Sequence, residues 1–521
     1  MNAHTPIAVT LLLTSTLAAA APLRWAAQND ILSLDPHAAN HGTTTTLTGY
    51  AYESLVRYTE KFEIEPALAT KWTQVSPTQI RFELRRGVKF HDGQAMTAED
   101  VVYSMARIRH PASKMTVFAT GIKDVRKVDD YTVDLLLDSP QPVLLRNLTY
   151  VRVLSKEWLV KNKCEKPQEL KDKEETFCSR NANGTGRYKV VSWQPDQKLQ
   201  FTQNAAWWDQ PRGNVTELTY LPIKQDATRV AALLSGDVDL LTDLPPQDVA
   251  KLKADPRLKI IDGPENRTIF FFMDQGSDEL RGSSVKGRNP FKDKRVRQAL
   301  SLALDREAIK RSMMRGYSVP AGLMVAPGTA GWSADLDTAT PVDLARAKAL
   351  LAEAGYADGF EVPLRCPNDR YVNDEEICQA AVAMWSKIGV RAKLTTQPMS
   401  QFTPALQAFD LVFGLYGWGV NTFDAQYTLQ DIVHTRTSGA DGKGNYFRLS
   451  DPVVDGLVQQ MRSETDPAKR LGQMQDALKR TRDEVLFIPL HHQVRPWAMK
   501  AGVSIPHAAN DAPQIRLATV K

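Results

Sequence analysis

Residue types suited to holding a ligand are concentrated in the segment Phe413–Leu429, FGLYGWGVNTFDAQYTL. Trp418 stands between Gly417 and Gly419, and Tyr416 precedes them. Glycine lets a backbone approach a ligand closely, and aromatic rings provide apolar walls and stacking faces. A binding cleft needs such walls together with a few polar groups that face the ligand. The segment therefore predicts one wall of a binding cleft, in which Tyr416 and Trp418 contact the ligand.

Asp424 is an acidic residue of this segment, and the sequence leaves two roles open for it. Its carboxylate can bind a cationic group of a ligand. It can equally accept hydrogen bonds from the first backbone N–H groups of a following helix, as an N-cap residue does. Both roles stay open at this point.

Signatures of catalysis are missing from the sequence. It contains no HExxH zinc helix, no G-x-S-x-G nucleophile turn and no GxxxxGK[ST] phosphate loop. His491 and His492 are adjacent, but neighbours on a strand point to opposite faces, so we expect one buried and one exposed histidine rather than a shared metal. The sequence favours a binding protein with no catalytic residues, metal or other cofactor.

The elements that must position these residues follow one another as short strands, capped helices and Pro/Gly loops. This alternation predicts an α/β fold. Residues 80–85 alternate apolar and polar side chains, as a half-buried strand does, and Thr97 can cap the helix that follows. Asp293 and Asp305 stand where two further helices can begin.

The N-terminal residues predict export. Residues 1–20 carry no Asp, Glu, Lys or Arg, and Ile7–Ala20 is almost entirely apolar or small. The apolar run is shorter than the ~20 residues that span a bilayer, and it ends in small residues that suit signal-peptide cleavage. We expect a signal peptide over residues 1–20, cleaved before Ala21. No cysteine near the cut offers a lipid anchor, so a soluble periplasmic protein is expected.

The length and charge of the chain limit its class. A mature chain of about 500 residues is long enough for two or three lobes. The formal net charge of +5 over 521 residues is mild, and no basic tract is interleaved with aromatics. We therefore expect no nucleic-acid partner.

The chain has four cysteines, which fall into two close pairs. In an oxidising compartment the simplest pairing is local, Cys164 with Cys178 and Cys366 with Cys378. A four-thiolate metal site is disfavoured because no C-x-x-C spacing occurs. We expect two structural disulfides.

Several segments resemble the large solute-binding proteins that supply bacterial ABC importers with dipeptides, oligopeptides, nickel chelates and opines. Residues 80–108, IRFELRRGVKFHDGQAMTAEDVVYSMARI, resemble the family's "LR.GVKFHDG…TAEDVVYS" pattern. Residues 291–309 resemble its "F.d..VRqAls.AiDR..I" helix pair, and residues 184–209 its "GTGPY…l..N..YW" block. Residues 226–239 match "R..al.sGevD". The chain is therefore similar to extracellular solute-binding proteins of family 5.

The resemblance implies a bilobal periplasmic binding protein fold of the class II type, with two α/β lobes, a hinge and an extra inserted subdomain. Mapped onto this chain, residues 22–58, 183–268 and 488–521 form the first lobe. Residues 59–182 form the inserted subdomain, which mostly does not touch ligand in this family, and residues 269–487 form the second lobe.

The resemblance also implies residues that bind the solute. Peptide-binding relatives carry an Asp three residues after the tryptophan, where it pairs with the peptide's α-ammonium, but here that position is Asn421. Relatives often have an Arg and a Tyr in the segment that here reads LRCPNDRYVN, and Arg370 and Tyr371 resemble that pair. A guanidinium there can bind a ligand carboxylate bidentately. A disulfide between Cys366 and Cys378 would rigidify this loop and lower the ordering cost of binding.

The first lobe is expected to contribute the hydroxyl-rich loop that contains Thr43 and Thr44. Their hydroxyl groups can exchange hydrogen bonds with a ligand. One of these threonines can also cap a helix, and the two roles are compatible.

We therefore expect a monomeric periplasmic solute-binding subunit of an ABC importer. It would close about a hinge over a small peptide or peptide-like solute and deliver it to the permease subunits in the inner membrane. A carrier of an opine or of a nickel or other metal chelate is the alternative that Asn421 favours. A secreted hydrolase is the alternative from another class, and the missing nucleophile motif speaks against it.

Overall fold

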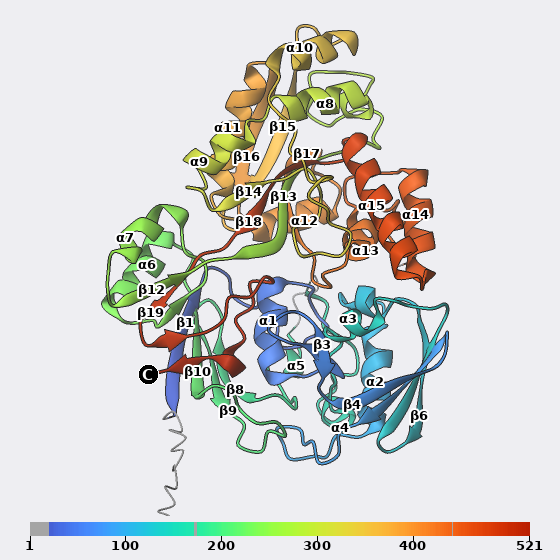
Figure 1. The fold of residues 1–521 in the computed structure, drawn as a ribbon, viewed down its shortest axis with the longest axis vertical. Coiled ribbons are helices and arrows are strands. Elements are labelled where there is room, and N and C mark those ends of the chain that lie inside the picture. The colour runs from blue at the N-terminus through green and yellow to red at the C-terminus, as the bar shows by residue number, and fades with distance from the viewer. Residues whose placement is uncertain (1–19, 171–174, 440) are drawn as a thin grey trace, which may run out of the picture.

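In the computed structural model, which describes residues 20–170, 175–439 and 441–521, the chain forms two α/β lobes and a smaller β-rich subdomain (Figure 1). Strands and helices alternate along the chain, which confirms the predicted α/β class. The predicted signal peptide, residues 1–20, lies outside the described residues apart from Ala20. None of the helices that the structure describes is long and apolar enough to span a membrane.

The first lobe is built on a seven-stranded sheet in the order β12-β19-β11-β1-β10-β9-β8. Its central strand β1 pairs in parallel with β10 and β11. Leu23 and Trp25 of β1 pack with Leu47 of α1 on one face, while Ala26 packs with Leu233 of α6 on the other. The elements are β1 (Ala21–Ala27), α1 (Gly42–Ala51), β8 (Tyr188–Gln194), β9 (Lys198–Gln203), β10 (Val215–Pro222), α6 (Asp226–Ser235), β11 (Leu240–Leu241), α7 (Val249–Lys253), β12 (Leu258–Ile261) and β19 (Trp497–Lys500).

The second lobe is built on a six-stranded sheet in the order β14-β18-β13-β17-β15-β16. Phe270 and Phe272 of β13 enter the core on one face, and Ile269 and Phe271 enter the core on the other. The strands are β13 (Pro264–Met273), β14 (Ser318–Pro320), β15 (Phe360–Pro367), β16 (Val390–Gln397), β17 (Phe413–Gly419) and β18 (Ile488–Val494). The helices around them include α8 (Lys294–Leu302), α9 (Arg306–Ser312), α10 (Leu344–Glu353), α11 (Asp374–Ser386), α12 (Met399–Gln407), α14 (Pro452–Ser463) and α15 (Pro467–Asp483).

The helix starts predicted in the second lobe are confirmed. Asp293 accepts a hydrogen bond from the N–H of Arg295 at the start of α8, and Asp305 accepts one from the N–H of Ala308 in α9. Each aspartate satisfies a backbone donor that has no partner inside the helix.

The chain passes between the two sheets twice, after Ile261 into β13 and after Val494 into β19. β13 and β18 are antiparallel partners from Pro264 and Val494 onward, and Figure 1 shows them running side by side toward the first lobe. The lobe boundaries expected at residues 268 and 488 fall inside or at the start of these strands. Because their ladder belongs to the six-stranded sheet, residues 264–268 and 488–494 pair with the second lobe rather than with the first.

The β-rich subdomain has a four-stranded antiparallel sheet in the order β4-β5-β7-β6. Its elements are β4 (Ala69–Ser76), β5 (Gln79–Leu84), α2 (Ala98–Ile108), β6 (Ile122–Asp129) and β7 (Thr132–Leu137). The predicted cap is confirmed as a reciprocal capping box, in which Thr97 accepts from the N–H of Glu99 and Asp100 accepts from the N–H of Thr97. Val101, Met105 and Ile108 of α2 fill the core against the sheet.

This subdomain contacts the loop that follows β17 in the second lobe. The rings of Phe62 and Phe423 lie 4.3 Å apart, and Arg146 of α3 (Leu144–Leu148) donates to the carbonyl oxygen of Thr422 at 3.2 Å. Phe62 and Phe423 have φ values of +59° and +53°, a left-handed conformation that costs an L-residue roughly 1–2 kcal/mol. The aromatic contact offsets part of this cost and holds the subdomain against the second lobe.

We predict that Phe62→Ala weakens this contact and favours an arrangement in which the lobes are further apart. Since aromatic pairs contribute about 0.5–1.5 kcal/mol beyond area burial, a solute enclosed between the lobes should dissociate about tenfold faster. Stopped-flow fluorescence measures the dissociation rate, and small-angle scattering measures the radius of gyration. The control is Phe177→Ala at a ring that is 49% exposed. Equal dissociation rates for the wild type and Phe62→Ala would contradict the prediction.

Candidate functional site

Two loops of the second lobe meet where parallel strands end. β15 and β17 run parallel, with Arg365 opposite Gly414, so Arg370 and Tyr371 follow β15 at the same edge at which Gly417–Gly419 end β17. Ligands of open α/β sheets bind outside such carboxyl ends. β13 enters the sheet beside this edge, with Arg267 opposite Gly419, which places the edge next to the crossover and hence toward the first lobe.

Tyr371 lies directly against the end of β17. Its hydroxyl donates to the carbonyl oxygen of Gly417 at 3.2 Å, and a Cβ on Gly417 would come within 2.7 Å of its ring. A side chain larger than hydrogen is therefore excluded at Gly417. The predicted close approach at this glycine is made by Tyr371 and by Ile269, whose Cδ1 would lie 2.6 Å from that Cβ.

Arg370 is a cation without a carboxylate partner among the described residues. Only its backbone N–H hydrogen-bonds, to Asp374 at 3.1 Å, and its guanidinium carbon lies 5.5 Å from the centroid of the Tyr371 ring. Burial lowers the pKa of Arg370, and the neighbouring Arg267 lowers it further. A Cβ on Gly42 would lie 3.9 Å from Nη2 of Arg370, so this guanidinium lies at the N-terminus of α1 in the first lobe.

The surroundings of Arg370 carry charge of both signs, since Arg267 lowers its pKa and the carboxylate of Glu265 raises it. Arg267 donates through Nε to Glu265 at 2.7 Å, and the same carboxylate accepts from Gln493 at 2.8 Å. The positive end of the α1 dipole points to the same place. Burial, together with Arg370 and Arg267, lowers the pKa of His41 to about 3, which keeps this imidazole neutral. The arrangement is rich in donors and suits an anionic group.

Tyr416 and Trp418 form an aromatic wall on β17. Tyr416 stacks on Phe402 with centroids 6.4 Å apart, and Trp418 stacks on Tyr427 at 5.3 Å. The indole Nε1–H of Trp418 is buried and has no hydrogen-bond acceptor among the described residues. This wall therefore offers one unused donor.

Tyr427 joins the wall to the first lobe. Its hydroxyl accepts from Nδ2 of Asn40 at 3.2 Å, and a hydrogen bond from Asn421 also reaches it. Asn421 is thus beside the contact between the lobes. We call the group formed by Asn40, His41, Arg370, Tyr371, Tyr416, Trp418 and Asn421 the interlobe site.

Asp424 has its carboxylate fully engaged by the protein. It is the N-cap of α13 (Ala425–Thr428), accepting from the N–H of Gln426 at 3.0 Å. Its two oxygens also accept from Nη1 and Nη2 of Arg470 at 2.7 and 2.9 Å, and the two side chains are only 5% and 9% exposed. The sequence left two roles open for Asp424, and the structure shows it in the role of helix cap.

Thr43 and Thr44 occupy the first turn of α1. The hydroxyl of Thr44 is buried, accepts from the N–H of Leu32 at 3.0 Å and lies 3.1 Å from Nδ1 of His41. The side chain of Thr43 is half-buried and makes no hydrogen bond to a described residue. The prediction that a threonine caps this helix is wrong, because His41 occupies the N-cap position and gives no side-chain cap.

The histidine pair is buried on both sides of β18. His491 and His492 are 2% and 1% exposed, so the expectation of one exposed histidine is wrong. His492 lies 2.8 Å from Oδ2 of Asp337 and 2.9 Å from Oγ1 of Thr268, which ties β18 to β13. Within the described ranges, no cluster of three or more His, Cys, Asp or Glu could hold a metal ion.

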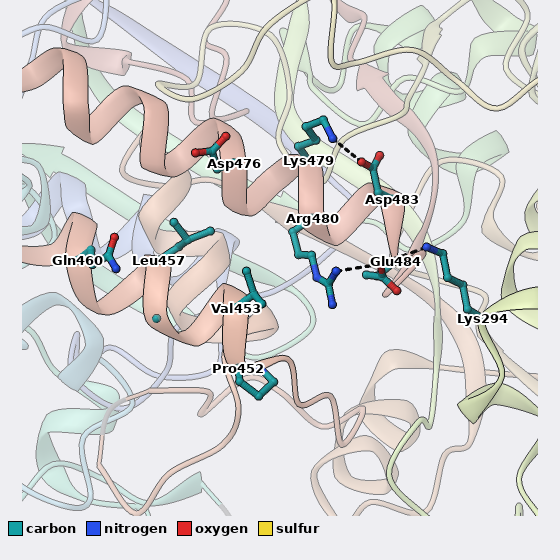
Figure 2. A pocket seen from close by; sticks show the side chains of 11 residues that line it. Lys294, Pro452, Val453, Leu457, Gln460, Asp476, Lys479, Arg480, Asp483 and Glu484 are labelled. Carbon is teal, nitrogen blue, oxygen red and sulfur yellow. Dashed lines mark hydrogen bonds and ion pairs between the residues drawn. The ribbon is translucent and has the colours of Figure 1, made fainter.

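A surface cavity of about 780 Å³ lies elsewhere in the second lobe, between α14 and α15 (Figure 2). Lys479 pairs with Asp483, and Glu484 binds both Arg480 and Lys294 along its edge. None of its lining residues belongs to the interlobe site. The cavity is a solvated groove between paired charges.

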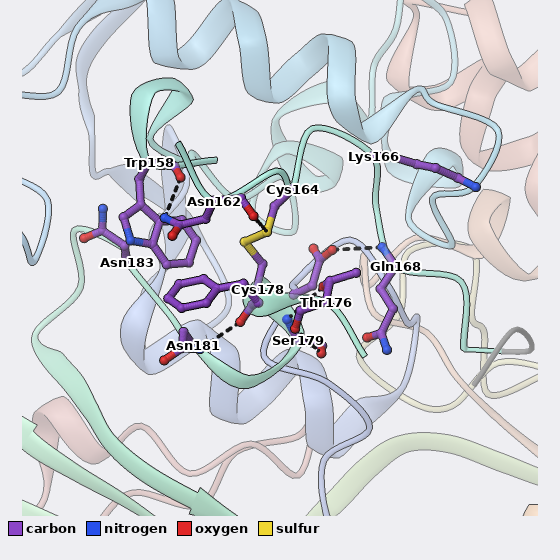
Figure 3. The surroundings of a disulfide bond; sticks show 12 residues. Trp158, Asn162, Cys164, Lys166, Gln168, Thr176, Cys178, Ser179, Asn181 and Asn183 are labelled. Atoms are coloured by element: carbon purple, nitrogen blue, oxygen red, sulfur yellow. Dashed lines mark hydrogen bonds between the residues drawn. A yellow bond between two sulfur atoms is a disulfide. The ribbon is translucent and has the colours of Figure 1, made fainter. Parts of the chain in front are cut away.

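Both predicted disulfides are present. Cys164–Cys178 joins the segment after α4 (Lys156–Lys161) to α5 (Phe177–Arg180), beside Trp158 and Asn162 (Figure 3). Cys366–Cys378 joins the end of β15 to α11. The loop that carries Arg370 and Tyr371 is thus closed at its base.

Sequence reasoning missed Arg267, which belongs to no segment expected to contact the solute. Asn40 and His41 lie in the loop that was expected to contribute from the first lobe, and Tyr427 lies in the segment Phe413–Leu429, but no separate role was predicted for these three residues. The signal that the sequence offered for Arg267 was a charged residue two positions before the apolar run of β13. Its neighbour in space, Arg370, lies about a hundred residues further along the chain.

Two α/β lobes joined by two crossovers, with polar groups from both lobes meeting at strand ends, define the class of bilobal binding proteins. The model of the bacterial extracellular solute-binding proteins, family 5, matches residues 63–440. The chain belongs to this family, and the predicted family and fold are confirmed.

Curated relatives that match most of the chain are named as binding proteins. Heme-binding protein A of Haemophilus influenzae is 27% identical over 85% of this chain and 82% of its own length. The periplasmic murein peptide-binding protein MppA of Escherichia coli is 26% identical over 89% of this chain and 87% of its own.

Solved structures share the fold. The dipeptide-binding protein of Pseudoalteromonas sp. SM9913 in complex with Met-Leu has a TM-score of 0.83 and 21% identity, covering 96% of this chain and 100% of that one. AgaA of A. tumefaciens in complex with agropinic acid has a TM-score of 0.82 and 23% identity, covering 96% and 99%.

We predict that the two disulfides differ in function. Removing either one by a double Cys→Ala change should lower the free energy of unfolding by about 3 kcal/mol, because each closes a short loop. Only Cys366→Ala with Cys378→Ala should also weaken solute binding, since it releases the Arg370 loop. Denaturant melts and calorimetry with a bound solute measure the two effects, and equal losses of affinity in both variants would refute the distinction.

We predict that Asp424→Ala destabilises the protein by about 3–5 kcal/mol, because it leaves the buried charge of Arg470 unpaired. Asp483→Ala, which removes a more exposed partner of Lys479, should change stability by about 1 kcal/mol or less. Chemical denaturation compares them. An Asp424→Ala protein of unchanged stability and lost solute affinity would instead show a ligand anchor.

Proposed function

We propose that this protein is the periplasmic solute-binding subunit of an ABC importer, a monomer that captures a small peptide or peptide-like solute and delivers it to permease subunits in the inner membrane. It performs no catalysis and needs no cofactor. Its family, and relatives such as the murein peptide-binding protein of E. coli, support this proposal.

The observation that carries the proposal is the buried guanidinium of Arg370. A buried charge without a partner is strongly unfavourable, and removal of one partner from a buried pair typically costs several kcal/mol. Here no described carboxylate pairs with Arg370, while Arg267 and the α1 N-terminus lie nearby. A carboxylate on the solute, bound bidentately, would supply the missing partner.

Closure about the two crossovers follows from the same geometry. Arg370 and Trp418 belong to the second lobe, and Asn40 and His41 to the first, so a solute that binds both sets favours the arrangement with the lobes together. Tyr371, Tyr416, Asn421 and Thr43 complete the proposed contacts, whereas the carboxylate of Asp424 caps α13 and pairs with Arg470.

A carrier of an opine or metal chelate is the second candidate, and the neutral Asn421 favours it because no acid stands there to bind an α-ammonium. Native mass spectrometry of the purified protein, with identification of co-purified small molecules, tests both. Recovery of peptides supports the first candidate, and recovery of an opine or a nickel complex replaces it.

We predict that Arg370→Gln lowers solute affinity about 30-fold or more, since truncating one partner of a buried charge pair costs about 2–5 kcal/mol. The unliganded variant should be at least as stable as the wild type, because an unpaired buried charge is removed. Calorimetry and thermal melts measure both quantities, with Arg391→Gln as the control at a 57%-exposed arginine. Unchanged affinity would remove Arg370 from the site.

A further inference from the structure

Four aromatic rings form a stack that crosses from the second lobe into the β-rich subdomain. Trp418 and Tyr427 stack with ring centroids 5.3 Å apart. Tyr427 also stacks on Phe118 at 5.7 Å, and Phe118 stacks on Tyr150 at 4.8 Å. The planes of successive rings differ by only 25°, 17° and 17°. We call these four side chains the aromatic stack.

The aromatic stack is assembled from elements of both bodies. Trp418 lies near the end of β17 and Tyr427 belongs to α13, both in the second lobe. Phe118 lies in the 3₁₀ turn Thr116–Ala119 of the subdomain, and Tyr150 follows α3. Figure 1 shows α13 at the end of the second lobe that faces α3. The complete stack therefore forms only while the subdomain and the second lobe are in contact.

Tyr427 is the middle of this arrangement. Its ring is 6% exposed and stacks on Phe118, which is fully buried, and on Trp418, which is half-buried and belongs to the interlobe site. Its hydroxyl accepts a hydrogen bond from Asn40 of the first lobe at 3.2 Å. A single side chain thus contacts the aromatic wall of the site, the first lobe and the subdomain.

The contact of Phe62 with Phe423 also holds the subdomain against the second lobe, but it involves no residue of the interlobe site. The same is true of the hydrogen bond from Arg146 to Thr422. The aromatic stack differs from both, because it joins the subdomain to Trp418, a residue that is proposed to touch the solute.

We propose that Tyr427 is a positioning residue that couples solute binding at Trp418 to docking of the β-rich subdomain. The subdomain then contributes to solute affinity through stacked rings rather than through contact with the solute. This inference rests on the proposed function and assigns a further part of the chain to it.

The coupling has a simple physical origin. A solute that packs on Trp418 restricts the orientation of the indole ring, and the stack needs an indole ring that is nearly parallel to Tyr427. Restricting Trp418 in advance lowers the conformational entropy that is lost when the stack forms. By linkage, a solute that favours the stack is itself favoured by the stack, by the same factor.

The alternative is that the four rings only fill the boundary between the two bodies. Proximity in space does not by itself demonstrate coupling. If the rings are filling alone, loss of Phe118 would destabilise the fold but leave solute affinity unchanged. Variants at the subdomain end of the stack distinguish the two possibilities.

Phe118→Leu removes a ring that does not belong to the interlobe site. The matched control is Phe82→Leu in β5, since Phe82 is also fully buried in the core of the same subdomain. Both variants should lose similar stability in thermal melts. Only Phe118→Leu should also lose affinity, about fivefold, for a pooled library of di- and tripeptides measured by calorimetry.

Variants of Tyr427 separate its ring from its hydroxyl. Tyr427→Phe keeps a ring that can stack and loses only the hydrogen bond from Asn40. Tyr427→Leu loses both. We expect Tyr427→Phe to bind the pooled peptides within about twofold of the wild type, and Tyr427→Leu to lose about fivefold or more. Equal losses in the two variants would overturn the role of the ring.

Double electron–electron resonance measures closure without a solute. The four cysteines are all in disulfides, so spin labels attach selectively at Val128→Cys in β6 and at Val342→Cys in the second lobe, both exposed positions. The labelled protein should populate a shorter distance without solute, because the stack consists of its own rings. Phe118→Leu and Trp418→Leu should each lower the ratio of shorter to longer distances about fivefold, and the double variant should match either one.

Each other outcome has a definite consequence. Multiplying effects of Phe118→Leu and Trp418→Leu, or equal losses of affinity in Phe118→Leu and Phe82→Leu, overturn the coupling and leave the proposed function standing. A labelled protein that never shows the shorter distance overturns the stack as a contact in solution. Failure of the wild type to bind the pooled peptides overturns the peptide class of the proposed function, while the distances still decide the coupling of Phe118 to Trp418.

Discussion

The antiparallel ladder between β13 and β18 is the constraint on which the rest of the structure depends, because both crossovers between the lobes leave from it. It fixes where Arg267 emerges and sets the edge at which β17 ends. An ion network holds the base of this ladder. Arg495, directly after β18, binds Asp243 of the first lobe and Asp511 of the C-terminal segment, the latter at 2.8 Å. The lobes can then move only about these two short connections.

Charge is distributed unequally between this base and the interlobe site. Around Arg495 the carboxylates are paired, and burial raises the pKa of Asp511 to about 6 where three carboxylates share few cations. Near Arg370 the carboxylate of Glu265 accepts from Arg267 and Gln493 instead. Pairing at the base stabilises the fold, whereas the unpaired guanidinium lowers stability and is available for a solute, a trade-off typical of binding sites.

Predictions from the sequence are correct where an interaction between residues close in the chain decides the structure. The caps at Thr97, Asp293 and Asp305 and both cysteine pairs agree with the sequence. The burial of His492 was missed because Asp337 and Thr268 reach it from other segments. The expected threonine cap was wrong in part because the hydroxyl of Thr44 accepts from the N–H of Leu32. Asp424 could not be decided from its neighbours, since its partner Arg470 lies on another helix.

The sequence by itself determined the family, the alternation of strands and helices, and the residues able to stack on or bind a solute, because these depend on side-chain type and short spacing. Only the tertiary structure decided which charges remain unpaired. Asp424 is neutralised by Arg470, whereas Arg370 forms no ion pair with a described carboxylate. Whether two charges pair depends on their distance in space, which cannot be inferred from their separation along the chain.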